Sequence, residues 1–146
     1  MAKAVRAIII QNNKILLMRR NKQGGDYYTL VGGAVKANES AEQALVREVK
    51  EESGLDVTHA RLVFIEEHPA PYNEQQIFLC EIVPREAVAI QDFTEEALLN
   101  KLDYNTHEPV WTTANLFSNV PFRTPQLQNA ICTALLKGFP AEPIKL

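Results

Sequence analysis

The chain has 146 residues, of which 46% are hydrophobic and 23% are charged, and its net charge at pH 7 is −3. This length and mixture predict one globular domain spanning residues 1–146, with enough apolar content for one core. There is no basic stripe of the kind that binds duplex nucleic acid, and no apolar run reaches the roughly 18 residues that cross a membrane. Composition therefore argues against duplex nucleic acid and membrane as the main partners.

The two cysteines and the N-terminal segment bear on the compartment. The first residues have neither the apolar stretch nor the small-residue cleavage site of a secretory leader. Cys80 and Cys132 lack the spacing of metal ligands, and we interpret them as reduced core thiols, with a disulfide between them as the alternative. These features predict a cytoplasmic protein.

The first third of the chain predicts three strands. They are the apolar and β-branched segments 5–10, 15–20 and 27–31, the first two joined into a hairpin by a turn-rich segment. Gly32 and Gly33 follow the third strand, and they predict a tight turn at which the backbone approaches a ligand closely.

Residues 40–53 predict a helix that has signals at both ends. Ser40 and Gln43 have the spacing of a capping box, and Gly54 suits the left-handed residue that ends a helix. The residues between them are good helix formers, with no proline and no internal glycine.

Three glutamates, Glu48, Glu51 and Glu52, are surface neighbours on this predicted helix. Glu48 and Glu52 border its apolar face, which Leu45 and Val49 form. Like charges that are partly buried are costly unless something compensates them, and a hard divalent cation with oxygen ligands does so. The cluster therefore predicts a metal site, and a solvated acidic stripe is the alternative.

The rest of the chain predicts alternating strands and helices. They are strands at 57–67, 75–83 and 109–112, a short helix at 94–102, and a helix from Pro125 to about Lys137. Thr124 is the expected N-cap of the last helix, and Gly138 is expected to end it. Strands before and after a central helix, with a further helix at the end, predict an α/β sandwich.

Residues 33–55 also carry a spaced motif. It consists of Gly33, five residues, Glu39, seven residues, and then the segment from Arg47 to Leu55, whose sequence is REVKEESGL. It resembles the Nudix box, G-x5-E-x7-R-E-U-x-E-E-x-G-U with U apolar, at every fixed position. Seven fixed residue types have chance odds of roughly one in a billion per starting point, at about 1 in 20 per position. The resemblance implies the Nudix fold, a mixed β-sheet sandwiched between helices. It also implies metal-dependent hydrolysis of the diphosphate linkage in nucleoside diphosphate derivatives.

The resemblance assigns roles to the residues of the motif. The implied metal ligands are Glu48, Glu51, Glu52 and the backbone carbonyl of Gly32. The ion is Mg²⁺, with Mn²⁺ as the alternative, and Glu51 and Glu52 are also implied as catalytic carboxylates. Glu39 and Arg47 are implied as a structural pair that orients the loop and the helix.

Four residues outside the motif are further candidates. Arg20, the second arginine of a strand end, resembles a residue that contacts a substrate phosphate, and a solvated charge is the alternative. Glu108 resembles a distal glutamate that acts as an extra metal ligand or as a base, and a surface carboxylate is the alternative. Tyr28 and Tyr72 are candidates to stack on a base, and packing in the core is the alternative.

The substrate within this class stays open. Pro69 resembles a marker of ADP-ribose hydrolases and Tyr72 a marker of dinucleoside polyphosphate hydrolases, so neither decides, and nucleoside triphosphates are a third class. Many members have Pro-Gly-Gly at the start of the box, whereas this chain has Leu30, Val31, Gly32 and Gly33, and the loss of the proline puts the loop geometry and the substrate type in doubt. A Nudix-fold sensor that binds a nucleotide without cutting it is the alternative function, and a homodimer is left open.

Overall fold

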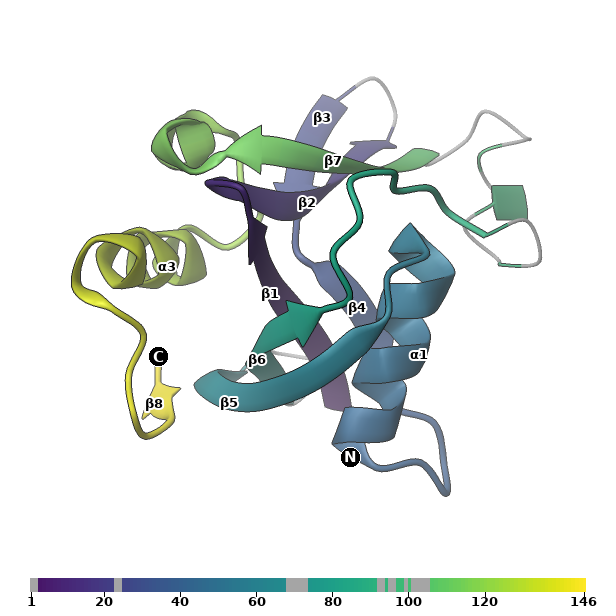
Figure 1. The fold of residues 1–146 in the computed structure, drawn as a ribbon, viewed down its shortest axis with the longest axis horizontal. Coiled ribbons are helices and arrows are strands. Elements are labelled where there is room, and N and C mark those ends of the chain that lie inside the picture. The colour runs from purple at the N-terminus through teal and green to yellow at the C-terminus, as the bar shows by residue number, and fades with distance from the viewer. Residues whose placement is uncertain are drawn as a thin grey trace.

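A computed structural model describes residues 3–22, 25–67, 74–91, 94, 97–98, 100 and 106–146. The elements are β1 (Lys3–Gln11), β2 (Lys14–Lys22), β3 (Gly25–Thr29), β4 (Val31–Ala34), α1 (Ala41–Ser53), β5 (Val57–Glu67), β6 (Glu74–Ile82), β7 (Thr106–Thr113), the 3-10 helix η1 (Ala114–Asn119), α3 (Pro125–Lys137) and β8 (Ile144–Lys145). Helices α1 and α3 lie on opposite sides of the strands (Figure 1). The predicted α/β arrangement of a sheet between helices is confirmed.

The strands form a mixed sheet in the order β3-β2-β1-β6-β5-β8, with β4 also paired to β1 and β7 also paired to β2. β1 runs parallel to β6, and β5 runs parallel to β8, whereas the other pairs are antiparallel. The N-terminal part of β1 pairs with β4, and its C-terminal end pairs with β2. β1 therefore joins the two parts of the sheet, and α1 packs beside the β4 part (Figure 1).

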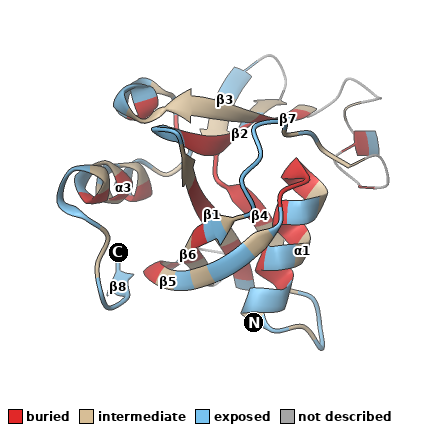
Figure 2. Cartoon of the chain, in the orientation of Figure 1, coloured by how far each residue is buried: buried red, intermediate tan, exposed pale blue. Residues whose placement is uncertain are grey.

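Two apolar clusters, one on each face of the sheet, form the core. Successive strand residues point to opposite faces, so β1 and β2 contribute alternate residues to the two clusters. One cluster packs against α1 and contains Val5, Ala7, Ile9, Leu16, Met18, Leu45 and Val49. The other packs against α3 and η1 and contains Ile8, Ile15, Leu17, Phe117, Leu127 and Ile131. Figure 2 shows this distribution, with β1 and β2 largely buried and α1 and α3 each buried along one side.

The glycine segment differs from its prediction. The expected strand at 27–31 is interrupted at Leu30, and Gly32 and Gly33 lie in β4 rather than in a tight turn. In β4 these glycines pair with Arg6 and Val5 of β1. The backbone approach that glycine permits is therefore an approach to the neighbouring strand and to α1.

Other predicted elements agree with the structure to different extents. The helices at 40–53 and 125–137 and the strand at 57–67 have the predicted bounds to within one residue. β8 in the C-terminal tail was not predicted. Within the expected helix 94–102, the structure describes a Thr94 hydroxyl that accepts from the Ala97 N–H at 3.1 Å. The remainder of that segment lies mostly outside the described residues.

Cys80 is buried, Cys132 is partly buried, and both are free thiols. Burial raises the pKa of the Cys80 thiol to about 12, because a thiolate loses its hydration there. The two cysteines are reduced side chains of the structure, as the sequence predicted. No helix in the described part of the chain is long and apolar enough to cross a membrane.

Candidate active site

Helix α1 is held at both ends by the predicted caps. The Ser40 hydroxyl accepts from the Gln43 N–H at 3.1 Å, and the Gln43 side chain accepts from the Ser40 N–H at 2.9 Å. Gly54 ends the helix in the left-handed conformation, with φ of 80°. Because Leu45 and Val49 are fully buried against the sheet, the rotation of the helix is fixed, and the glutamate cluster is turned toward β4.

A cavity of about 450 Å³ lies between α1, β4 and β2. Three carboxylates from α1 line one wall, namely Glu48, Glu51 and Glu52. Four cationic side chains line the cavity as well, namely Arg6, Arg20, Lys36 and Arg47. An acidic wall and several guanidinium groups suit a ligand that carries anionic groups together with a cation.

Two glycines of β4 set how closely the backbone approaches this cavity. Gly32 has φ of 147°, and a Cβ atom there would lie 2.0 Å from the Val5 carbonyl oxygen. A Cβ atom on Gly33 would lie 2.6 Å from the carboxylate carbon of Glu48. Position 32 therefore requires glycine, and Gly33 leaves the space in which the Glu48 carboxylate lies.

Arg47 connects the segment before α1 to the carboxylates of α1. Its guanidinium forms a two-bond fork with Glu39, with Nε–Oε2 of 2.7 Å and Nη2–Oε1 of 2.9 Å. The same group donates to the Ala34 carbonyl at 3.1 Å, to Glu48 at 2.9 Å and to Glu51 at 3.3 Å. The geometry agrees with the expected structural pair and adds contacts to two carboxylates of the cluster.

The hydrogen bond from Arg47, together with the smaller contribution of the Lys36 N–H, which donates at 3.0 Å, lowers the pKa of Glu39 from 4.5 to about 2. Glu39 correspondingly raises the pKa of Arg47 above its usual range. A carboxylate whose pKa falls on folding stabilises the folded protein above its unfolded pKa. That contribution is lost as the pH falls through the folded value.

We therefore expect Glu39→Gln to be less stable than the wild type near neutral pH. The difference should shrink as the pH falls from 4.5 to about 2, the window between the two pKa values of Glu39. Urea unfolding midpoints measured across that window check the result. A difference that stays constant with pH would mean that the Glu39 charge is not stabilised by folding.

Glu48 and Glu52 are buried, with exposed fractions of 8% and 4%, which is unusual for carboxylates. Glu52 accepts from the Gly32 N–H at 3.0 Å, and Glu48 accepts from Arg47. Among the described residues, no three His, Cys, Asp or Glu side chains converge to hold a metal ion in this conformation. The Arg47 guanidinium therefore neutralises part of the negative charge of Glu48 and Glu51, a function that the sequence predicted for a metal cation.

The donor set nevertheless fits a hard divalent cation. The cluster presents carboxylate oxygens, which such ions prefer, and it lines a cavity rather than the outer surface of α1. The Gly32 carbonyl, expected as a further ligand, accepts from Arg6 Nη1 at 3.1 Å. A carbonyl oxygen has a second lone pair, so this hydrogen bond is compatible with a ligand role.

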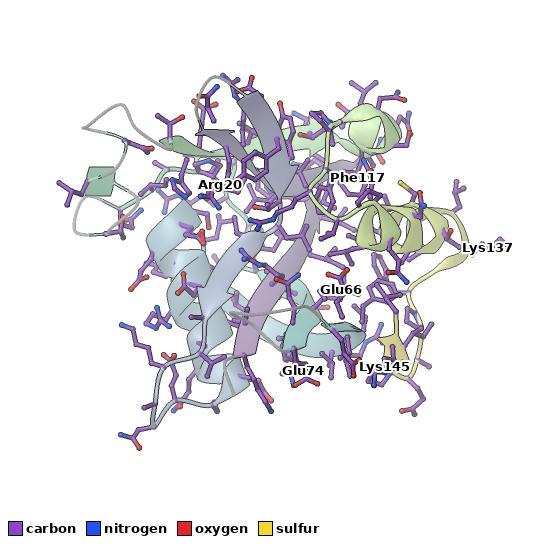
Figure 3. The ribbon with its side chains drawn as sticks, turned by 180° about the vertical axis from the view of Figure 1, so that it is seen from behind. Arg20, Glu66, Glu74, Phe117, Lys137 and Lys145 are labelled. Atoms are coloured by element: carbon purple, nitrogen blue, oxygen red, sulfur yellow. The ribbon has the colours of Figure 1, made fainter. Side chains whose placement is uncertain are left out.

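Arg20 lines the cavity, and the alternation of β2 explains why it does so rather than Arg19. Leu16 and Met18 point to the α1 face, so Arg20 continues that face and Arg19 points away. The Arg20 guanidinium carbon lies 5.5 Å from the centre of the Tyr27 ring, within the range of a cation–π contact. Figure 3 shows Arg20 near the end of α1.

Glu108 and Tyr28 are not brought to the cavity, contrary to expectation. In the β2–β7 register, Glu108 is opposite Arg19, 62% of its side chain is exposed, and the two charges lie 3.8 Å apart. Tyr28 packs against the cluster on the α3 side. Successive side chains of a strand point to opposite faces, so Glu108 and Tyr28 point away from the face of the sheet that meets α1. Tyr72, the other stacking candidate, and Pro69 lie outside the described residues.

His107 and Arg6 are cavity residues that the sequence did not indicate. His107, opposite Arg20 in the β2–β7 register, is 9% exposed and lines the cavity. Its backbone makes two hydrogen bonds with the Asn100 side chain, at 2.6 and 2.7 Å. The alternation of a strand that continues to residue 106 would have favoured His107 over Glu108. No feature of the sequence indicated Arg6 as a site residue, because it lies in an apolar segment far from the motif.

Comparisons with known proteins agree with this geometry. The family model described as NUDIX domain matches residues 1–125. The NAD-capped RNA hydrolase NudC of Pseudomonas aeruginosa is 32% identical over 96 residues, which are 66% of this chain and 34% of that protein. NudC of Pectobacterium carotovorum is 36% identical over 73 residues, which are 50% of this chain and 28% of that protein. The chain matches about a third of the length of these relatives.

Solved structures share the fold. The E. coli ORF135 protein has a TM-score of 0.69 at 24% identity, covering 97% of this chain and 95% of that one. An ADP-ribose pyrophosphatase from Streptococcus suis has a TM-score of 0.67 at 24% identity, covering 99% and 98%. MutT from Aliivibrio salmonicida and Vibrio cholerae has a TM-score of 0.67 at 20% identity, covering 94% and 98%. The fold expected from the motif is therefore confirmed.

Proposed function

The chain belongs to the NUDIX domain family, and from that membership we propose that it hydrolyses the diphosphate linkage of nucleoside diphosphate derivatives. The observation that carries the proposal is the cavity, in which three carboxylates of α1 face arginine side chains. A diphosphate bridge has several anionic oxygens, so it needs cationic partners and a group that activates water.

The side chains divide this work between them. Glu48, Glu51 and Glu52 would hold Mg²⁺, or Mn²⁺ as the alternative, with the Gly32 carbonyl as a further ligand. A bound divalent cation supplies positive charge against the phosphate oxygens and makes water easier to deprotonate. Glu51 and Glu52 would be the carboxylates that accept a proton from water in the cavity.

Substrate binding is assigned to the cationic wall. Arg20 would hold a phosphate group, because its planar guanidinium can donate two parallel hydrogen bonds to phosphate oxygens. Arg47 is committed to Glu39 and to Ala34, and its role is to hold the segment before α1 against the helix. Glu108, which is exposed beside Arg19, is left out of this assignment.

The substrate class follows from what the relatives act on. NudC acts on NAD-capped RNA and the Streptococcus suis protein on ADP-ribose, and both substrates contain a nucleoside joined through a diphosphate. We propose a substrate of this kind, and the test is phosphate or nucleotide release with Mg²⁺. The panel should hold ADP-ribose and nucleotide sugars, dinucleotides such as NAD and dinucleoside polyphosphates, and nucleoside triphosphates.

Turnover of one of these classes at the P–O–P bridge supports the proposal. Saturable nucleotide binding without turnover, in Mg²⁺ and in Mn²⁺, would instead identify a nucleotide-binding sensor domain. No turnover and no binding across the panel would overturn both assignments.

Adding Mg²⁺ is expected to raise the melting temperature of the metal-free protein. A ligand that binds only the folded state stabilises it by mass action, by about 2.7 kcal/mol at a hundred times its dissociation constant. Calorimetric scans in chelator and in excess Mg²⁺ check this result. Identical curves in the two buffers would mean that the acidic wall holds no cation.

The matched variant replaces Glu48, Glu51 and Glu52 together with glutamine, and it should lose the response to Mg²⁺. Removal of like-charge repulsion alone would leave this variant no less stable than the wild type without metal. The variant also loses the ion pairs of Arg47 with Glu48 and Glu51, which offsets the relief of repulsion. The variant should therefore gain little or no stability in chelator.

A further inference from the structure

A chain of hydrogen bonds leads from the far side of the sheet to the cavity. Gln75 of β6 donates to Glu66 of β5 at 3.0 Å and accepts from Arg6 Nε of β1 at 3.0 Å. Arg6 Nη1 then donates to the carbonyls of Leu30, at 3.3 Å, and Gly32, at 3.1 Å. None of these side chains belongs to the spaced motif.

The path ends on a carboxylate of the acidic wall. The peptide unit after Gly32 is held through its carbonyl by Arg6, and the N–H of the same residue donates to Glu52 at 3.0 Å. Gly32 has no side chain and has φ of 147°, so its own backbone preference does not fix its orientation. The β1–β4 ladder holds β4 on both sides of Gly32, and Arg6 adds hydrogen bonds to the carbonyls that flank the Val31–Gly32 peptide, so the Arg6 contacts contribute to the position of the Gly32 N–H and of Glu52.

Glu66 and Gln75, the first two residues of this hydrogen-bonded path, are polar side chains that are buried, and burial of polar groups costs free energy. Glu66 is 5% exposed and Gln75 is 9% exposed, and a buried carboxylate is unfavourable unless its charge is compensated. Figure 3 shows Glu66 within the molecule, whereas the nearby Glu74 and Lys145 lie at its edge. The β5–β6 register sets Glu66 opposite Gln75, and the β1–β4 register sets Arg6 opposite Gly32.

We propose that Glu66 and Gln75 are positioning residues of the cavity. They orient Arg6, Arg6 holds the Leu30 and Gly32 carbonyls on either side of the Val31–Gly32 peptide, and the N–H of that peptide holds Glu52 in place. Substitution of residues that orient the ligands of a metal site typically lowers metal affinity or activity by about ten- to a hundredfold. The catalytic part of this inference rests on the proposed hydrolase function, and the geometric part does not.

The decisive variant is Gln75→Leu, which cuts the path at its middle. Its matched control is Gln76→Leu, the same change one residue along β6, where the side chain points to the other face. Amide hydrogen exchange of the metal-free protein, read by NMR, should show the Gly32 N–H exchanging at least about tenfold faster in Gln75→Leu. The Gln76→Leu control should leave that rate unchanged.

An exchange of the two residues tests whether the path itself matters. In Glu66→Gln with Gln75→Glu, the carboxylate introduced at position 75 can accept from Arg6, and the amide introduced at position 66 can donate to that carboxylate. This double variant should restore the Gly32 exchange rate. If Gln75→Leu does not fold, Gln75→Asn takes its place: it keeps the polar amide but shortens the side chain by one methylene, which withdraws it from Arg6 and Glu66.

Steady-state kinetics distinguish an effect on the position of Glu52 from an effect on the stability of the fold. In Gln75→Leu, kcat should fall at least about tenfold while KM stays within about twofold, and the double variant should recover kcat. Unchanged Gly32 exchange, or unchanged kcat beside faster exchange, would overturn the inference. A wild type without hydrolytic activity whose Gly32 exchange follows the expected pattern would instead overturn the proposed function and leave the path in place.

Discussion

Glu52→Gln is expected to keep the fold and to lose most of the hydrolytic activity. Glutamine has nearly the same shape, and its side-chain oxygen can still accept from the Gly32 N–H, as Glu52 does at 3.0 Å. What it removes is one negative charge from the buried wall of the cavity, where that charge would hold a cation and accept a proton. We expect turnover to fall more than about tenfold, which corresponds to about 1.4 kcal/mol in the activation barrier.

The control for this change is Glu42→Gln, on the exposed first turn of the same helix. It removes the same charge from α1 without touching the cavity, so its turnover should match the wild type. Steady-state kinetics at saturating Mg²⁺, with melting temperatures measured in parallel, make the comparison. If Glu52→Gln retained more than about a tenth of wild-type turnover, the assigned role of Glu52 would be wrong.

Arg47→Ala is expected to lower both the stability and the activity. It removes the fork to Glu39, the hydrogen bond to the Ala34 carbonyl and the contacts to Glu48 and Glu51. The segment before α1 then loses its attachment to the helix, and the acidic wall loses its neighbouring positive charge. We expect the melting temperature to fall by several degrees and turnover to fall with it.

Lys50→Ala is the matched control for Arg47→Ala. Lys50 lies on the outer face of the same helix and pairs with Asp56, and both side chains are about half exposed or more. Exposed pairs of this kind contribute little, so the control should keep its melting temperature and its turnover. An Arg47→Ala protein as stable as the wild type would count against the structural pairing of Arg47 with Glu39.

Local signals in the sequence were enough for the bounds of α1 and α3. The capping box at Ser40 and Gln43 and the glycine at position 54 set the bounds of α1, because each acts within about one helical turn of the residue it stabilises. The same holds for α3, whose start at Pro125 and end before Gly138 were both read correctly. Helical spacing alone also made the three glutamates neighbours and set Glu48 and Glu52 beside the apolar face.

The tertiary structure decided which residues outside the motif reach the cavity. Arg20 was correctly preferred to Arg19, but Glu108 was preferred to His107, and Arg6 was missed altogether. These outcomes depend on the registers of β2 with β7 and of β1 with β4, and a shift of one residue exchanges the two faces of a strand. Register is set by contacts between segments tens of residues apart, so it cannot be read from the few residues around each position. The sequence alone determined α1, α3 and the acidic cluster, whereas the long-range pairing of strands determined what faces that cluster.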